Sequence, residues 1–262
     1  MKRVGLMNGK MTLAEIRKKA EEMPLEDAVS WLCDIMPDYG ISVARLADTF
    51  SKRLIRMKEE KKRLLKMSEF EIQARSQGFV YIGGIDEAGR GPLAGPVVAG
   101  CVVLPENCFI EHLNDSKKLT PSLRDKLFDI IIREALDYGI GMVMPEEIDE
   151  INIYNATRKA MIQAVSSLKK APDYLIIDAM ELPLNIRQLS VNKGDSLSIS
   201  VAAASIIAKV TRDRWMEEVH KMYPQYGFIR HKGYGTQEHM EAIKKYGLCP
   251  IHRKTFTHGL VG

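Results

Sequence analysis

Two adjacent acidic residues, Asp86 and Glu87, end an apolar run and are followed by Gly89-Arg90-Gly91. Carboxylates at a strand end, next to glycines that let a ligand approach the backbone, are typical of active sites. A bare Asp-Glu pair is more often only a polar strand end before a turn. The pair therefore indicates an active site only if other carboxylates occupy equivalent positions.

Two further aspartates do so. Asp178 ends the apolar segment YLIID, and Asp195 in NKGDS follows a short strand candidate and precedes a helical segment. Either one alone is more often a cap or turn residue, but if the strand ends meet, Asp86, Glu87, Asp178 and Asp195 form one cluster. Buried anions this close would repel one another, and two divalent cations would neutralise them. Two metal ions about 3.5 to 4 Å apart are suited to in-line displacement at phosphorus.

The same glycines formally match the dinucleotide-binding fingerprint GxGxx(G/A) at residues 89–94, with Asp115 at roughly the expected distance beyond it. That fingerprint requires a helix that opens at the glycines. Here Pro92 and Pro96 lead instead into VVAGCVVL, a strand candidate, and two carboxylates precede the glycines. We therefore reject a nucleotide cofactor.

The elements that must position these residues begin near residue 79. Segments rich in β-branched and aromatic residues predict strands: FVYIGGI, VVAGCVVL, DYGIGMVM, YLIIDA and residues 187–191. Helices are predicted between them, because Thr120 precedes Pro121 and Pro145 precedes two glutamates, as at many helix starts. This order predicts an α/β fold, a mixed sheet flanked by helices.

Residues 1–70 have a different pattern, which predicts a small all-helical module before a sheet domain in residues 71–262. Thr12 and Glu15 have the spacing of a capping box, and apolar residues repeat at helical spacing after Pro24. The module is basic: residues 52–66 carry eight Lys/Arg and two Asp/Glu. Such a segment fits a phosphate backbone, and it equally fits a solvated helix face with Glu/Lys pairs.

Composition limits the class of protein. The chain has 262 residues, of which 45% are hydrophobic and 27% charged, so it is expected to fold rather than to be disordered. It contains no stretch of about 18 to 20 apolar residues and no apolar signal core near its start, so we expect a cytoplasmic protein outside the membrane. Its four cysteines lack disulfide or zinc spacing. Its histidines show no metal-ligand spacing either, and a structural role is expected for His231, His239, His252 and His258.

Taken in order, these motifs resemble bacterial ribonuclease HII over about residues 78–258. The resemblance is carried by DEAGRGPLAGPVVA, NDSKKL, EIDEINIYNAT, IID, KGD, AASIIAKVTRDR, YPQYGF, HKGYGT and HR. Ribonuclease HIII is similar in its carboxylates, but it lacks Gly-Arg-Gly and has a β-containing N-terminal domain. Both features favour HII.

The resemblance implies an RNase H-like fold and a metal-dependent endoribonuclease. Such an enzyme cleaves RNA in RNA/DNA hybrids and on the 5′ side of single ribonucleotides in duplex DNA, leaving 3′-hydroxyl and 5′-phosphate ends. By the same resemblance, Asp86, Glu87, Asp178 and Asp195 are the catalytic and metal-binding residues. One Mg²⁺ or Mn²⁺ would activate water and a second would stabilise the leaving 3′-oxygen. A monomer is the family expectation.

Further positions match the family's substrate contacts. Gly89, Arg90 and Gly91 match its junction-reading motif, in which exposed backbone binds a 2′-hydroxyl. Tyr234 matches a tyrosine that stacks on the next deoxyribose, and Lys117 matches a phosphate-contacting lysine. Lys193 and Ser205 are weaker candidates. Outside the resemblance, Arg90 and Tyr234 would each be taken for ordinary surface or packing residues.

Residues 1–70 have no counterpart in the catalytic motifs, and we expect this module to aid substrate binding. One alternative function is a non-catalytic hybrid-binding protein on the same fold, which all four intact acidic positions disfavour. Another is a different nuclease or transposase on an RNase H-like fold, which would not need Gly-Arg-Gly together with Tyr234.

Overall fold

The structure is a computed structural model that describes residues 10–260, and it divides the chain into two compact units, one ending at Arg63 and one beginning at Leu64. The first unit is helical throughout its described part, as expected. It contains α1 (Leu13–Glu21), α2 (Leu25–Tyr39) and most of α3 (Ile41–Met67). The predicted capping box is confirmed, because the Thr12 hydroxyl accepts from the Glu15 N–H and the Glu15 carboxylate accepts from the Thr12 N–H. The core of this unit includes Ile16, Leu32 and Phe50.

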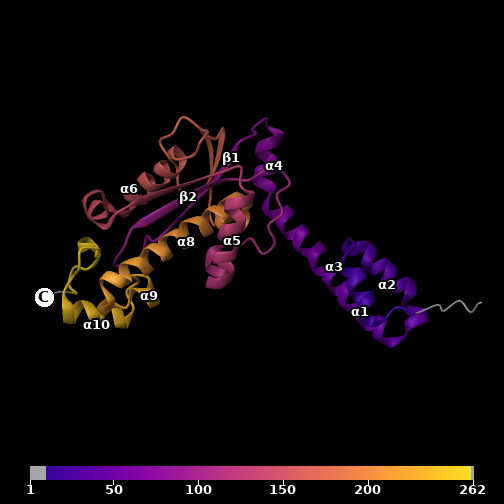
Figure 1. Cartoon of the computed structure of the whole chain (residues 1–262). Coiled ribbons are helices and arrows are strands. Elements are labelled where there is room, and N and C mark those ends of the chain that lie inside the picture. Colours follow the sequence, from indigo (N-terminus) through magenta and orange to yellow (C-terminus); the bar gives the residue numbers. More distant parts are fainter. Residues whose placement is uncertain (1–9, 261–262) are drawn as a thin grey trace, which may run out of the picture. The chain divides into compact units, whose positions relative to one another are not determined.

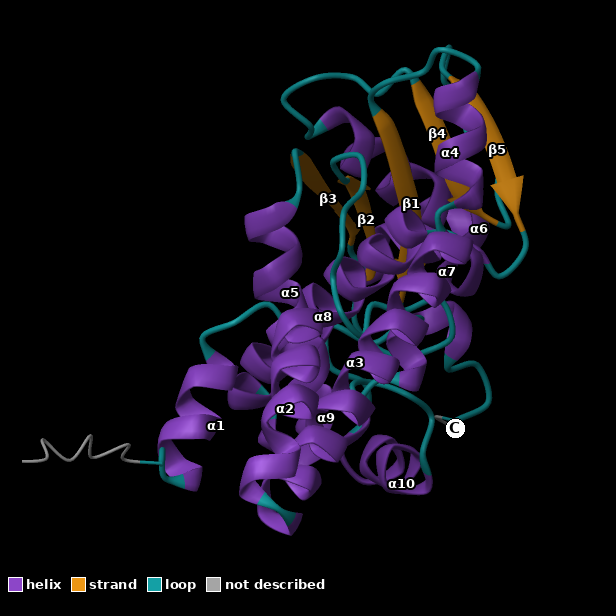
Figure 2. Cartoon of the chain, turned by 90° about the vertical axis from the view of Figure 1, so that its right-hand side faces the viewer, coloured by secondary structure: helices purple, strands orange, loops and turns teal. Residues whose placement is uncertain are grey.

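The second unit is built on one five-stranded sheet with the order β3-β2-β1-β4-β5 (Figure 2). β2 pairs antiparallel with both β1 and β3, whereas β1, β4 and β5 run parallel. The mixed α/β fold is therefore confirmed. The strands and helices of the unit are α4 (Glu69–Ser76), β1 (Ile82–Ala88), β2 (Val97–Val103), α5 (Pro121–Glu134), β3 (Asp137–Val143), α6 (Pro145–Ser166), β4 (Tyr174–Asp178), β5 (Arg187–Val191), α7 (Gly194–Leu197), α8 (Ile199–Met222), α9 (Phe228–His231) and α10 (Gln237–Tyr246).

Helices cover both faces of this sheet (Figure 1). On one face α6 packs on β1 to β4 around Ile85, Ala160 and Ile177. On the other face α5 and α8 pack against Val102 of β2. The N-terminal half of α8 contacts the sheet closely: a Cβ at Gly84 of β1 would lie 2.2 Å from the backbone of Ser200, and one at Gly100 of β2 would lie 2.6 Å from the carbonyl oxygen of Ala204. Glycine at these positions lets α8 lie directly on β1 and β2.

The boundary between the two units differs from the expected one at residues 70/71, which would cut α4. Instead, α4 belongs wholly to the sheet domain, where Ala74 packs beneath β4. The buried carboxylate of Glu71 accepts hydrogen bonds from the Ser198 hydroxyl at 2.5 Å and from the Ser200 N–H at 3.0 Å. It thereby satisfies donors at the N-terminus of α8. The module-domain division follows this packing and falls inside α3 rather than in a loop.

None of the helices between residues 10 and 260 combines the length and the apolar composition that a membrane-spanning helix requires.

Three buried histidines organise the C-terminal part of the sheet domain, and their role is structural, as expected. His231 donates through Nε2 to the carbonyl of Tyr226, and His239 donates through Nδ1 to the carbonyl of Tyr234. The Nε2 atoms of His239 and His252 lie 3.0 Å apart, so one shared proton joins these two rings. A second proton on either ring would place two N–H groups face to face.

Acidification is therefore expected to lower the free energy of unfolding. Burial lowers the pKa of both His239 and His252 from 6.5 to about 4. Between these pH values the unfolded chain binds protons that the folded chain does not, so stability declines as the pH falls from 6.5 and levels off below about 4. Each ring accounts for on the order of 3 kcal/mol. Urea unfolding from pH 4 to 7, compared with His252→Asn, measures the effect. Ring pKa values at or above 6.5 in an NMR titration of the folded chain would contradict it.

Candidate active site

Asp86 lies in β1, two residues before its end, and Asp178 is the last residue of the neighbouring parallel strand β4. Ile85 of β1 pairs with Ile177 of β4, so the two aspartates follow directly from paired residues. Asp86 is 3% exposed, and its carboxylate accepts the N–H of Glu87 at 2.7 Å. The juxtaposition depends on β4 lying beside β1, a pairing between distant parts of the chain.

Asp195 reaches the same sheet edge through a short turn. β5 pairs with β4 up to Val191, and Lys193 then adopts a left-handed conformation with φ of 61° before α7. The Gly194 N–H donates to the Asp178 carboxylate at 2.8 Å. This bond ties the turn that carries Asp195 directly to the strand end that carries Asp178.

Two cations contact the acidic residues from outside. The Arg90 guanidinium lies 3.3 Å from the Glu87 carboxylate. The Lys117 ammonium lies 3.1 Å from the Asp195 carboxylate and 3.8 Å from that of Asp115, and its side chain is 74% exposed. Lys117 therefore lies between the acidic residues and the solvent.

The acidic residues carry more negative charge than their surroundings neutralise. Burial first, and then Glu87, Asp178 and Asp195, raise the pKa of Asp86 well above its ordinary value. Burial also raises the pKa of Glu87, against the opposing effect of Arg90, and that of Asp195, against the opposing effect of Lys117. The four predicted carboxylates therefore lie within electrostatic range of one another.

The donor set fits a hard divalent cation. Carboxylate oxygens are the ligands that Mg²⁺ and Mn²⁺ prefer, and a bound cation would relieve the repulsion that raises these pKa values. In the described part of the chain, no three His, Cys, Asp or Glu side chains are already arranged around a common metal position. The fit is therefore one of charge and chemistry, and binding would draw the carboxylates closer.

The Gly-Arg-Gly loop follows the acidic pair and lies against Tyr234. A Cβ at Gly91 would meet only the Tyr234 ring, at 3.9 Å. Gly89 differs: it has φ of +95°, and a Cβ there would lie 2.2 Å from Nε of Arg212. The fold thus requires glycine at position 89 but not at position 91, where the space beside the backbone is open. Tyr234 is 45% exposed, so its ring is accessible to a ligand.

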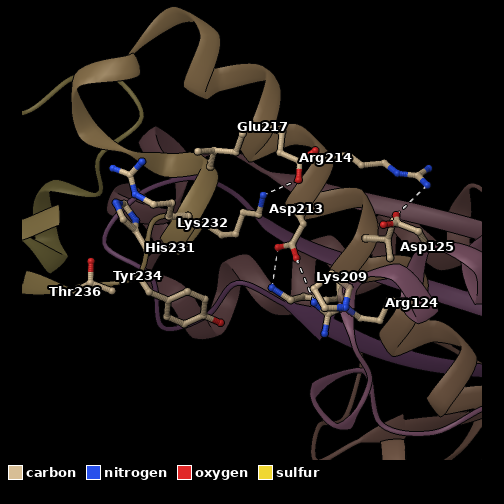
Figure 3. A pocket seen from close by; sticks show the side chains of 14 residues that line it. Arg124, Asp125, Lys209, Asp213, Arg214, Glu217, His231, Lys232, Tyr234 and Thr236 are labelled. Atoms are coloured by element: carbon tan, nitrogen blue, oxygen red, sulfur yellow. Dashed lines mark hydrogen bonds and ion pairs between the residues drawn. The ribbon is translucent and has the colours of Figure 1, made fainter. Parts of the chain in front are cut away.

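A cavity of about 660 Å³ opens beside Tyr234, between α5, α8 and the segment after α9 (Figure 3). Its basic side chains are paired with acidic ones: Lys209 with Asp213, and Lys232 with Glu217. The lining contains more basic than acidic residues, and its basic members are Arg124, Lys209, Arg214, Arg230 and Lys232. The cavity therefore has a small excess of positive charge next to the tyrosine.

The structure corrects one weaker expectation. Ser205 is only 1% exposed, and its hydroxyl accepts the N–H of Ser116, so it holds the turn before Lys117 and is not open to substrate. Lys193 is exposed. Sequence reasoning gave no site role to Asp115, which raises the pKa of Asp195, or to the buried Arg212 and Arg253. Their only sequence signal was membership in motifs of the resemblance.

Comparison with known proteins agrees with this geometry. Residues 83–259 match the family model described as Ribonuclease HII. The chain is 53% identical to a ribonuclease HII of Acetivibrio thermocellus over 97% of this chain and 99% of the relative, and 52% identical to one of Clostridioides difficile over 95% and 98%. Both matches are long enough to include much of the helical unit.

Two solved structures match about two thirds of the chain. The ribonuclease H2 of Pyrococcus horikoshii superposes with a TM-score of 0.58 and 34% identity, covering 67% of this chain and 93% of that one. An Archaeoglobus fulgidus ribonuclease HII, solved in complex with PCNA, gives 0.56 and 26%, covering 67% and 94%. Together with the acidic residues of β1 and β4, these similarities show that the chain belongs to the ribonuclease HII family, whose members are divalent-metal-dependent endonucleases of the ribonuclease H class.

Proposed function

We propose that this chain cuts on the 5′ side of single ribonucleotides in duplex DNA, as well as within longer hybrids, and leaves 3′-hydroxyl and 5′-phosphate ends. The observation that carries the proposal is the position of Tyr234 beside Gly91. Gly91 belongs to the loop that directly follows the acidic pair. A ribonucleotide read at this loop would present its phosphodiester bond to the four carboxylates. An all-DNA duplex lacks the 2′-hydroxyl that the loop would read.

The chemistry falls to Asp86, Glu87, Asp178 and Asp195. Bound Mg²⁺ or Mn²⁺ would supply a deprotonated water and charge stabilisation at the leaving 3′-oxygen, in the two-metal manner typical of the family. The carboxylates would hold the cations, and strand pairing between β1 and β4 fixes the spacing of Asp86 and Asp178. Lys117, whose exposed ammonium lies 3.1 Å from the Asp195 carboxylate, would contact a phosphate oxygen of the substrate.

The remaining substrate contacts lie on either side. Arg90 and the backbone of Gly89 and Gly91 would contact the ribose, and the exposed Tyr234 ring would stack on the deoxyribose that follows. The basic side chains of the cavity beside Tyr234 would then follow the sugar-phosphate backbone beyond the junction. In this arrangement, the Gly-Arg-Gly loop and the segment that carries Tyr234 would select the ribonucleotide, and the four carboxylates would support cleavage.

The test is cleavage of a DNA duplex that contains one ribonucleotide, with Mg²⁺ or Mn²⁺ and mapping of the cut. A single cut 5′ to the ribonucleotide, with the all-DNA duplex left intact, is the expected result. No cut with either metal ion would leave the non-catalytic hybrid-binding protein as the better account. Because the relatives are bacterial, we propose that the chain acts on chromosomal DNA in the cytoplasm. We also propose that it acts as a monomer. Light scattering of the free chain measures its oligomeric state.

We also propose that the basic part of α3 adds affinity for duplex backbone. Arg53 and Arg56 are both exposed on this helix. Replacing both by glutamine in the full-length chain should weaken duplex binding and make the slope of log K against log salt shallower, by about 0.9 for each lost phosphate contact. Fluorescence anisotropy at several salt concentrations measures both effects.

A matched variant separates this effect from loss of net charge. Arg17→Gln with Lys18→Gln removes the same charge from exposed positions on α1 of the same unit. This control should bind with a nearly unchanged slope. Equal slopes for the two double variants would remove the role of α3.

A further inference from the structure

Arg253 is a fully buried arginine whose guanidinium donates hydrogen bonds to the backbone of the Gly-Arg-Gly loop on its inner side. Its Nη2 donates to the carbonyls of Gly89 at 2.6 Å and Gly95 at 2.7 Å, its Nη1 to that of Arg90 at 2.9 Å, and its Nε again to Gly95 at 2.9 Å. One planar group thus satisfies carbonyls on both sides of the loop.

Arg212 of α8 is also fully buried and connects the same loop to the tyrosine segment. Its Nε donates to the carbonyl of Pro96 at 2.9 Å, its Nη2 to that of Ala94 and its Nη1 to that of Lys232, both at 3.0 Å. Its guanidinium carbon lies 5.9 Å from the centre of the Tyr234 ring. Arg212 therefore ties residues 94–96 to the segment that carries Tyr234.

Both guanidinium groups direct these hydrogen bonds to backbone carbonyls. The acidic residues in their electrostatic range bind elsewhere: Asp213 pairs with Lys209, and Asp149 accepts the N–H groups of Lys254 and Thr255. Burial and then the proximity of Arg212 lower the pKa of Arg253 to about 9, which leaves it charged near neutral pH. Two buried cations whose hydrogen bonds go to neutral carbonyls, with no carboxylate partner, are costly for stability alone, so their placement calls for another explanation.

The carbonyl contacts also set the direction of the amide groups. The N–H and C=O of a trans peptide unit point in opposite directions, and the described chain has no cis peptide bonds. With the carbonyls of Gly89 and Arg90 turned inward to Arg253, the N–H groups of Arg90 and Gly91 point outward. Neither of these N–H groups donates a hydrogen bond within the described part of the chain. They are open donors, aligned by a contact on the far side of the loop.

We propose that Arg253 and Arg212 are positioning residues for ribonucleotide recognition: they align the outward N–H groups of Arg90 and Gly91 and hold Tyr234 in register with them. The inference rests on the proposed junction-reading role of this loop. The proposal predicts that changing either buried guanidinium group reduces the binding free energy contributed by the 2′-hydroxyl, although neither group contacts that hydroxyl.

The experiment measures that contribution by binding. Full-length chain is titrated with two duplexes that differ only in one ribonucleotide or deoxyribonucleotide, with Ca²⁺ in place of Mg²⁺ to keep the strands intact. The ratio of the two Kd values reports the contribution of the 2′-hydroxyl. Arg253→Lys keeps the charge but loses the planar fork, and it should reduce the ratio about 10-fold or more, with the all-DNA Kd within about twofold of wild type. Arg75→Lys is the control, because Arg75 also donates to carbonyls, those of Val80 and Leu104, but from α4.

The outcomes separate the two proposals. A wild-type ratio of one would overturn junction reading by this loop. A clear wild-type preference that persists in a folded Arg253→Lys variant would overturn only the positioning role. If Arg253→Lys does not fold, Arg212→Lys is measured in the same way. Loss of the folded state in both variants, by circular dichroism, would also overturn the positioning role, since the two residues would then support the fold as a whole.

Discussion

Replacing Asp86 by asparagine is expected to lower the rate of cleavage at a single ribonucleotide by about 10³-fold or more, equivalent to about 4 kcal/mol of transition-state stabilisation. The reason is charge. Asp86 is the most buried of the four carboxylates, and Glu87, Asp178 and Asp195 all raise its pKa. An amide has nearly the same shape but removes one of the anionic ligands that hold the cations. Single-turnover cleavage of the ribonucleotide-containing duplex measures the effect.

The same variant should melt at a higher temperature than wild type when metal is removed by EDTA at pH 7. Burial and neighbouring carboxylates raise the pKa of Asp86, so its contribution to stability is greatest below its ordinary pKa of 3.8 and is lost as the pH rises toward the folded-state value. Asparagine is neutral and avoids this loss. Adding Mg²⁺ should then stabilise wild type more than the variant, because the cation binds the folded acidic cluster.

These readouts distinguish a catalytic loss from misfolding. A variant that is inactive but more thermostable without metal supports the assignment. A variant that cleaves at close to the wild-type rate, or that melts below wild type in EDTA, would contradict the placement of Asp86 in a metal-binding cluster.

Alanine at positions 89 and 91 is expected to act in two different ways, although both are glycines of one motif. At Gly89 the added Cβ meets Arg212 at 2.2 Å and the carbonyl of Pro96 at 2.7 Å, in a backbone with φ of +95°. Backbone strain and overpacking each cost about 1 to 3 kcal/mol. We expect Gly89→Ala to lower the melting temperature by roughly 10 °C and to impair all cleavage.

Gly91→Ala is the matched comparison. Its Cβ meets only the Tyr234 ring at 3.9 Å, and Gly91 has no positive φ, so stability should change by less than about 0.5 kcal/mol. The methyl group would instead fill the space where we place the ribose, and cleavage of the single-ribonucleotide duplex should fall about 100-fold. Thermal melts and cleavage rates of both variants test the pair. Full activity of Gly91→Ala would remove the proposed contact at that position.

Much of the sheet domain could be predicted from sequence because its signals are local. Strand runs, helix caps such as Thr120 and the acidic ends of the runs at Asp86 and Asp178 all depend on neighbours within a few residues. The convergence of the four carboxylates was a conditional prediction, and it required that the strands share a sheet. The boundary of the helical module was less accurate, because α4 reads as another helix of that module until its packing under the sheet is known.

Local sequence patterns predict which segments become strands and helices, and which residue types could bind metal and ribose. The position of β4 beside β1, the burial of Ser205 and the different roles of Gly89 and Gly91 became known from the folded chain. The tertiary structure also showed that Arg212 and Arg253 bind the inner side of the substrate loop. The physical reason is range: local propensities are set by adjacent residues, whereas strand order, burial and the direction of a peptide group depend on contacts between distant segments that form only when the chain packs.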